Sequence, residues 1–277
     1  MVKRIKTKRK HRRKYKKRSQ KIKFKPIYKK SKNKKYKKQI WGYNNHKELI
    51  DSFIDNGDIT KDSKIHTALM KVDRGDYCDG TKCYLDSPSS IGYEQTISAP
   101  HMHIKALKYL EDKLIPGSKI LDIGSGSGYL TAVFGYLVET NEKDNKSLVY
   151  GIDIYDELVK NSLNNIKKNN SDLLNHNKLN IIVGDGWAGY PDKNLLFDAI
   201  HVGASADELP INLWRQLKPG GKLIIPIQTE QREVFRLYNK PTYWNRICNI
   251  KPYECYKKNL FDVRYVPLQK NNKLISN

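Results

Sequence analysis

Three glycines at alternate positions follow an apolar run and an acid in ILDIGSGSGYL, residues 120–130. Glycine lets a backbone approach a ligand closely and accepts dihedral angles closed to other residues. A dinucleotide-binding loop reads GxGxxG, whereas Gly124, Gly126 and Gly128 make GxGxG, with Asp122 two residues before the first glycine. An acid facing the ligand repels a pyrophosphate and attracts a cation. The loop therefore predicts a cationic ligand.

Two further acids stand at the ends of the next predicted strands. Asp153 is placed to accept both hydroxyls of a ribose, and Asp185 in VGDG to receive an adenine amine. Each acid also has a structural interpretation: a helix cap for Asp122 or Asp153, a turn residue for Asp185. Three acids with a glycine loop after the first favour S-adenosyl-L-methionine (AdoMet), which carries a sulfonium and an ammonium and no phosphate.

The loop after the fourth predicted strand, HVGASADELP, limits the methyl acceptor. Methylation of an adenine amine usually shows a [DNS]-P-P-aromatic segment there, and cytosine C5 methylation needs a cysteine in a Pro-Cys context. The sequence has neither, and it offers no obvious general base nearby. This favours an acceptor that is already ionised, such as a carboxylate with its ordinary pKa of about 4.

Alternating strands and helices position these residues. Apolar runs of strand length alternate with amphipathic segments, which predicts right-handed crossovers and a doubly wound, mostly parallel sheet, an α/β fold. Ligands bind such a sheet beyond the carboxyl ends of its strands. The predicted strands are 119–123, 148–154, 180–183, 197–203 and 222–227, and the clearest helices 129–138, 156–168 and 207–217.

The flanking segments differ from this core. Upstream, apolar spacing predicts a helix ending at Gly57, a second beginning near Thr60 or Asp62, a long loop over 78–98, and a helix opened by Pro100. Downstream, short strand-like runs predict an antiparallel end to the sheet. They are residues 233–240, 242–250 and 261–269.

Charge is concentrated in the first 40 residues. They hold 22 of the 52 Lys and Arg and no acid, so residues 41–277 carry 30 basic and 29 acidic side chains. Such a segment cannot bury enough apolar surface to offset ordering entropy, so we expect a disordered tail. It could contact a polyanion such as nucleic acid, direct nuclear import, or be a solvated arm with no dedicated partner. We divide the remainder into 41–117, a cofactor-binding core over 118–230, and C-terminal strands over 231–277.

Location and redox state follow from what the sequence lacks. No apolar stretch is long enough to cross a bilayer, so we expect a soluble protein with no membrane contact. Cys78, Cys83, Cys248 and Cys255 are too few and too irregular for a disulfide framework or a zinc site. We expect reduced cysteines, no bound metal, and a cytoplasmic location, with the nucleus as an alternative because of the tail.

Longer motifs closely resemble the protein-L-isoaspartate (D-aspartate) O-methyltransferase family from about residue 46 to residue 268. The most specific is TISAPHMH, which AdoMet enzymes in general do not share. The matching segments are DRGDYC, YLDSPSSIGYEQTISAPHMH, LDIGSGSGYLTA, VGDGWAGY, FDAIHVGASA and LKPGGKLIIPI. The resemblance implies a class I, Rossmann-like AdoMet-dependent fold.

The resemblance also implies an activity: methyl transfer from AdoMet to the carboxylate of L-isoaspartyl residues, and of D-aspartyl residues as a further substrate, in damaged peptides and proteins. The active-site serine of the family corresponds to Ser98, as an orienting and not a nucleophilic group. A monomer is the family expectation. Cofactor contacts are implied at Gln95, Thr96, Ile97, Ser98, His103, Asp122, Gly124, Gly126, Asp153, Asp185 and Gly186.

Some features depart from the family pattern. Gln269 replaces the Thr that often follows the VPL motif, residues 139–147 look like a polar insertion, and the basic tail is not a usual family element. Two other functions stay open: an RNA-associated methyltransferase that uses the tail, and a non-catalytic AdoMet-binding module. Ser98 also has a structural interpretation, as the cap of the helix at Pro100.

Overall fold

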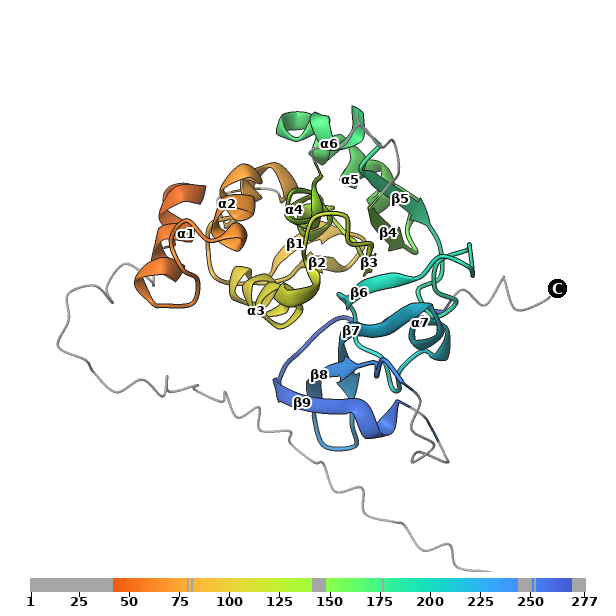
Figure 1. The fold of residues 1–277 in the computed structure, drawn as a ribbon. Coiled ribbons are helices and arrows are strands. Elements are labelled where there is room, and N and C mark those ends of the chain that lie inside the picture. Colours follow the sequence, from red (N-terminus) through yellow and green to blue (C-terminus); the bar gives the residue numbers. More distant parts are fainter. Residues whose placement is uncertain are drawn as a thin grey trace, which may run out of the picture. The chain divides into compact units, whose positions relative to one another are not determined.

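The computed structural model describes residues 42–78, 80, 82–140, 148–175, 177–243, 251 and 253–270. Contacts divide the chain into two units, Met1–Tyr36 and Lys37–Asn277. The first unit and the whole predicted tail lie outside the described residues, as does most of the insertion over 139–147. All elements below belong to the second unit (Figure 1).

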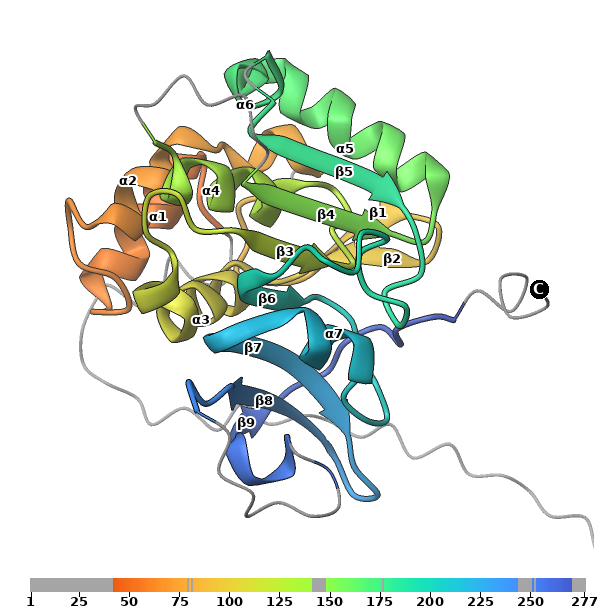
Figure 2. The same ribbon diagram turned by 45° about the vertical axis from the view of Figure 1, so that its right-hand side comes forward.

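A seven-stranded sheet with the order β5-β4-β3-β6-β7-β8-β9 forms the centre of this unit. Figure 2 shows the strands in this order. The first five are parallel, and β8 and β9 are antiparallel to their neighbours, as the sequence predicts. Order reverses at β3, whose neighbours are β4 and β6. The strands are β3 Ile120–Ile123, β4 Val149–Asp153, β5 Leu179–Val183, β6 Phe197–Val202, β7 Leu217–Gln228, β8 Glu233–Asn239 and β9 Lys257–Asp262.

Both faces of the parallel part are buried. Successive side chains of a strand point to opposite faces, and Ile120 belongs to one apolar cluster while Leu121 belongs to the other. The first cluster includes residues of α1 to α5, and the second includes Leu213 and Trp214 of α7. The helices thus cover two faces, which confirms the doubly wound fold. Central strands buried on both sides read as continuous apolar runs for this reason.

Helix ends follow local chemistry. Asn45 caps α1 through a hydrogen bond from the Glu48 amide, and Pro100 opens α3 as predicted. The second helix begins later than expected, because Ser63 accepts from the His66 amide and so caps α2. The helices are α1 His46–Asp55, α2 Lys64–Lys71, α3 Pro100–Leu110, α4 Tyr129–Val138, α5 Asp156–Asn169, α6 Ser171–Asn175 and α7 Ile211–Gln216, with 3-10 turns η2 Arg74–Tyr77, η3 Glu111–Lys113 and η4 Glu254–Tyr256.

Two local expectations are wrong. The predicted loop over 78–98 contains a hairpin, β1 Ser89–Gly92 paired antiparallel with β2 Gln95–Ile97, whose turn residues Tyr93 and Glu94 have positive φ. The strand expected over 261–269 instead ends at Asp262, and an extended segment follows it. A backbone hydrogen-bond partner of this extended segment is Ser205, which lies far away in the sequence, so local composition did not reveal the pairing. Most of the expected strand 242–250 lies outside the described residues.

The expectation of reduced cysteines is also wrong. Cys78 and Cys83 form a disulfide, and Cys255 is disulfide-bonded as well. The turn after η2 brings the first pair to a Cα–Cα distance of 5.9 Å, within the range that a disulfide needs. Spacing in the sequence did not show this approach. In the described residues no helix is both long and apolar enough to cross a membrane.

Candidate active site

The glycine loop connects β3 to α4 and bends sharply away from the sheet. Gly124, Gly126 and Gly128 have φ of 69°, 53° and 85°, a left-handed region that strains other residues. At Gly126 a Cβ would lie 3.1 Å from Ile91 Cδ1 of the hairpin, so the loop also passes close to β1. The glycines therefore have the conformational role that their spacing predicts.

Asp153 at the end of β4 holds the glycine loop. Its Oδ2 accepts from the Gly126 amide at 2.9 Å, and its Oδ1 accepts from the Tyr155 amide at 3.1 Å. The residue is only 7% exposed, and this burial raises the pKa of its carboxyl. Two carboxylate oxygens have about four acceptor positions, so capacity remains for the two hydroxyls of a ribose.

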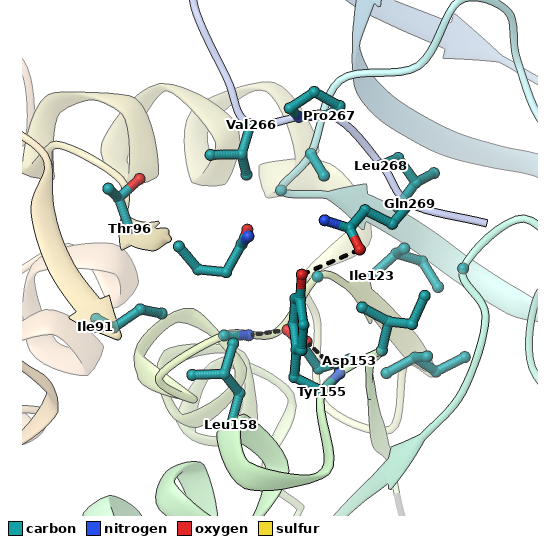
Figure 3. A pocket seen from close by; sticks show the side chains of 18 of the residues that line it. Ile91, Thr96, Ile123, Asp153, Tyr155, Leu158, Val266, Pro267, Leu268 and Gln269 are labelled. Atoms are coloured by element: carbon teal, nitrogen blue, oxygen red, sulfur yellow. Dashed lines mark hydrogen bonds between the residues drawn. The ribbon is translucent and has the colours of Figure 1, made fainter. Parts of the chain in front are cut away.

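Beside Asp153 lies a pocket of about 520 Å³, which we call the glycine-loop pocket. Figure 3 shows the side chains around it, with Asp153 and Tyr155 on one side and Thr96 and Val266 across from them. Its lining consists of the carboxyl ends of four parallel strands, the hairpin and the segment after β9. The lining residues are Ile91, Gln95, Thr96, Ile123, Gly124, Gly126, Ile152–Tyr155, Leu158, Gly184, Gly186, Gly203, Ala204 and Val266–Gln269.

The segment Val266–Gln269 closes one side of this pocket and is called the C-terminal strap here. It is held by long-range hydrogen bonds: Ser205 N donates to Val266 O at 2.8 Å, and Leu268 N donates to Ser205 O at 2.7 Å. Trp187 Nε1 donates to Leu268 O, and Tyr155 Oη donates to Gln269 Oε1 at 3.0 Å (Figure 3). The sequence marked Gln269 only as a departure, although it lines the pocket.

Asp122 is placed differently from the other acids. It is 1% exposed, is absent from the pocket lining, and accepts from Thr131 Oγ1 at 2.6 Å. Its other oxygen pairs with His201 Nδ1 at 2.8 Å. The carboxylate thus ties β3 to α4 and β6 beneath the glycine loop, as a support for that loop. Its predicted direct contact with a cofactor stays a prediction.

Asp185 and Gly186 follow β5. Asp185 accepts from the Trp187 amide at 2.8 Å, which makes the turn that the structural interpretation expects, and its side chain is not among the pocket residues. Gly186 lines the pocket, and a Cβ there would lie 2.5 Å from Ile123 Cγ2. The turn after β5 therefore lines the glycine-loop pocket with the backbone of its glycines and not with the Asp185 side chain.

The predicted residues 95–98 divide between two pockets. Gln95 and Thr96 line the glycine-loop pocket, and Ile97 is buried in the apolar core. Ser98 lines a second pocket of about 960 Å³, which we call the Ser98 pocket. It shares Thr96, Gly203 and Val266 with the first. Its other lining residues are Pro88, Ala99, His101, Met102, Lys105 and Phe261–Tyr265.

Two groups fix Ser98. Its side chain lies beside Tyr265 in the lining of the same pocket, a phenol whose pKa burial raises. Its carbonyl accepts from Arg74 Nη2 at 2.8 Å, and Arg74 Nε also donates to Cys83 O. No side-chain cap bond links Ser98 to α3, whose cap position is Ala99. The capping interpretation of Ser98 is therefore wrong, and the serine hydroxyl instead faces the residues after β9.

A buried polar cluster lies behind Ser98. Arg74 is 0% exposed, and burial lowers the pKa of its guanidinium to about 10, which leaves it charged at neutral pH. It lies 5.6 Å from the centre of the Tyr129 ring. His103 packs against the same Tyr129 ring, with the ring centres 5.2 Å apart, and burial lowers the pKa of His103 well below its ordinary value. His103 is neutral at physiological pH for this reason. It does not line either pocket, and its contact with a cofactor stays a prediction.

The two pockets differ in charge. No Lys or Arg is among the residues lining the glycine-loop pocket, and Asp153 is its carboxylate. Lys105, Arg264 and Asp262 line the Ser98 pocket, so its cations outnumber its carboxylates. In the described part of the chain no group of three or more His, Cys, Asp or Glu side chains could hold a metal ion. The arrangement suits a cationic ligand in the first pocket and an anionic one in the second.

The fold and the glycine-loop pocket define a class I AdoMet-dependent methyltransferase: a parallel sheet, a GxGxG loop after its first strand and an acid after its second. The chain belongs to the protein-L-isoaspartate(D-aspartate) O-methyltransferase family, whose model matches residues 44–273.

Curated relatives agree with this membership. Protein-L-isoaspartate O-methyltransferase 1 of Arabidopsis thaliana is 43% identical over 69% of this chain and 82% of its own. The enzyme of that name from Caenorhabditis elegans is 41% identical over 70% of this chain and 83% of its own.

Among solved structures, a Plasmodium falciparum protein assigned as a protein-L-isoaspartate O-methyltransferase, in complex with S-adenosyl-L-homocysteine, superimposes with a TM-score of 0.72. It is 39% identical and covers 83% of this chain and 100% of its own. Another protein-L-isoaspartate O-methyltransferase, at 22% identity and a TM-score of 0.64, shares the fold.

Proposed function

We propose that this chain transfers a methyl group from AdoMet to the free carboxylate of L-isoaspartyl residues, and of D-aspartyl residues as a further substrate, in damaged peptides and proteins. Family membership supports this activity. The single observation that carries the geometric argument is the junction of the two pockets at Thr96, Gly203 and Val266. A donor in the first pocket meets an acceptor in the second there.

The glycine-loop pocket fits AdoMet on several counts. Asp153 keeps acceptor positions for ribose hydroxyls, and Ile123, Ile152 and Leu158 supply apolar surface for an adenine. Gly186 leaves space that a Cβ would fill. The absence of Lys and Arg from the lining suits a sulfonium and gives a pyrophosphate no counter-charge. AdoMet supplies an electrophilic methyl group when bound.

The residues of the Ser98 pocket position the acceptor. An in-line displacement needs the attacking oxygen about 3 to 3.5 Å from the methyl carbon, so orientation is the main contribution a protein can make. We assign this task to the Ser98 hydroxyl, which Tyr265 and Arg74 hold in place.

No proton transfer is needed at this site. A carboxylate with its ordinary pKa of about 4 is ionised at neutral pH, so a general base has no role. Its charge is neutralised as it meets the sulfonium, and excluding water strengthens that attraction. The C-terminal strap and the hairpin supply this exclusion. The methyl ester then cyclises to a succinimide without the enzyme, and hydrolysis returns some normal aspartate, which makes the reaction a repair step.

The direct test compares two peptides that differ only in one L-isoaspartyl versus one normal aspartyl linkage, with labelled methyl on AdoMet. Base-labile label on the isoaspartyl peptide alone is the expected result. Label on RNA instead would favour an RNA-associated methyltransferase. AdoMet binding without any transfer would favour a non-catalytic module.

The remaining assignments concern partners and location. We propose a monomer in the cytoplasm, with the nucleus as an alternative, and contact between residues 1–40 and a polyanion such as nucleic acid. The 22 Lys and Arg of these residues support that contact. Deletion of residues 1–40 is expected to remove salt-sensitive RNA binding and to leave peptide methylation unchanged. Sedimentation measures the monomer, and microscopy of the full-length chain tests the location.

A further inference from the structure

Two cationic residues from different elements line the Ser98 pocket. Lys105 comes from α3, one helical turn after His101, and Arg264 comes from the segment between β9 and the C-terminal strap. The chemistry proposed above uses neither residue. Each projects into a pocket of about 960 Å³ that continues into the glycine-loop pocket.

Neither cation has a strong counter-charge. Lys105 Nζ lies 4.3 Å from the centre of the Phe261 ring and forms no ion pair in the described residues. Asp262, the acid among the lining residues, pairs with Arg232 at 3.2 Å, and His101 of the lining pairs with Asp86 at 2.8 Å. Arg264 interacts electrostatically with Glu233: burial raises the pKa of that carboxyl, and the charge of Arg264 opposes the rise.

This positive charge is local. Residues 41–277 carry 30 basic and 29 acidic side chains, so an overall excess of positive charge does not account for two weakly neutralised cations in the Ser98 pocket. The apolar Phe261 side of the pocket excludes part of the surrounding water and strengthens any ion pair formed there.

Distance limits what these cations bind. Lys105 is five residues after Pro100, which corresponds to about 7.5 Å along the axis of α3. An extended peptide advances about 3.3 Å per residue. If Ser98 orients the isoaspartyl carboxylate, Lys105 is placed to reach a second carboxylate within about two residues of it, and Arg264 lines the same pocket.

We propose that Lys105 and Arg264 form a carboxylate subsite that selects isoaspartyl peptides with another acidic residue within two positions of the damaged one. This inference rests on the proposed function and names the substrate class of the same site. The ligand is a Glu or Asp side chain of the peptide. Lys105 and Arg264 are specificity residues, since neither contacts the carboxylate that receives the methyl group.

The test compares isoaspartyl peptides that carry Glu or Gln at each of the positions −2, −1, +1 and +2. Wild type is expected to show kcat/KM about fivefold higher for Glu at one of these positions, the size of a partly exposed ion pair. Lys105→Met and Arg264→Met should each reduce this preference, the double variant should abolish it, and Lys105→Arg should retain it. Lys105→Glu should reverse it toward a peptide with Lys.

Lys167→Met is the matched control, because this exposed lysine of α5 lines neither pocket and removes the same charge. It should leave the preference unchanged. Equal kcat/KM for all Glu and Gln peptides in wild type would overturn the subsite and leave the methyltransferase function intact. A preference that survives in the double variant would overturn it too. Absence of transfer to every peptide would overturn the proposed function and the subsite together.

Discussion

The glycine-loop pocket and the Ser98 pocket meet at three residues and are built by different means. Glycine backbone makes part of the first: Gly124 and Gly126 of the loop, and Gly184, Gly186 and Gly203 after the neighbouring strands. Side chains from α3 and the segment after β9 make most of the second. One pocket has a carboxylate and no Lys or Arg, whereas the other has two weakly neutralised cations.

This difference suits a cationic methyl donor in the glycine-loop pocket and an acidic peptide in the Ser98 pocket. Glycines in a left-handed conformation tolerate little substitution, so they give the pocket a fixed wall. A fixed wall suits a cofactor that is the same in every reaction. Exposed side chains suit a peptide whose neighbouring residues vary. Substitutions in one pocket should therefore leave the function of the other unchanged.

Removing the acid of the glycine-loop pocket should have the largest effect. Asp153→Ala removes an acceptor for two hydroxyls, and hydrogen bonds to a charged group contribute about 1.5 kcal/mol or more each. AdoMet affinity should therefore fall about 100-fold, since about 1.4 kcal/mol corresponds to tenfold. Calorimetric titration with AdoMet measures it. A fall of less than threefold would contradict the assignment of Asp153.

Acidification should reproduce this loss. Burial raises the pKa of Asp153 above its ordinary value of 3.8, so the carboxyl becomes protonated at a higher pH in the folded chain than in the unfolded chain. AdoMet affinity should decline by up to tenfold per pH unit below that raised pKa. Without AdoMet, the same group makes the fold less stable as pH rises from 3.8 through the raised pKa. Titration with AdoMet and thermal unfolding, each repeated across pH, measure the two pH dependences. Asp153→Asn should remove both pH dependences.

Gly126→Ala should weaken AdoMet binding about tenfold. A left-handed conformation costs a residue other than glycine about 1–2 kcal/mol, and the new Cβ would lie 3.1 Å from Ile91. Gly57→Ala is the control, because Gly57 has a φ of 77° with no atom within 4 Å and lies at the end of α1. Both variants should lose similar stability, and Gly126→Ala alone should lose affinity. Equal affinities would show that the loop tolerates strain.

Ser98→Ala should act on the other pocket. Loss of one orienting hydrogen bond should lower kcat about tenfold and leave AdoMet affinity within twofold, because Ser98 does not line the glycine-loop pocket. Ser90→Ala, an exposed serine of β1, should leave both values unchanged. Steady-state methylation of an isoaspartyl peptide measures kcat. A loss of AdoMet affinity larger than the loss in kcat would assign Ser98 to the cofactor.

The smallest effect should come from the C-terminal strap. Tyr155→Phe removes an exposed hydrogen bond to Gln269 and should reduce AdoMet affinity about threefold. Gln269→Thr, which restores the residue common in the family, should change affinity by no more than that. Titration of both variants measures the difference. No change in either would show that the strap closes the pocket through its backbone bonds alone.

The residues with local signals could be predicted from the sequence. The glycine loop, Asp153 and Gly186 lie in the pocket because each follows a parallel strand, and parallel strands end at one edge. Helix α4 has the predicted bounds, Tyr129–Val138. These elements are determined by residues close to them in the chain.

Residues whose partners are distant in the sequence could not be predicted. The strap reaches the pocket through Ser205, Trp187 and Tyr155, and no local pattern encodes those contacts. Asp122 has the acid-before-glycine pattern of a ligand contact, yet Thr131 and His201 take up both its oxygens. The Cys78–Cys83 disulfide likewise depends on a turn that spacing alone does not show.

The most direct test of this account is a crystal structure with S-adenosyl-L-homocysteine and an isoaspartyl peptide bound together. We predict the ribose hydroxyls on Asp153, the isoaspartyl carboxylate within hydrogen-bonding distance of Ser98 Oγ, and the nearest carboxylate oxygen facing the sulfur across the junction at Thr96 and Val266. A ribose bound away from Asp153, or a peptide bound outside the Ser98 pocket, would contradict the division into donor and acceptor pockets.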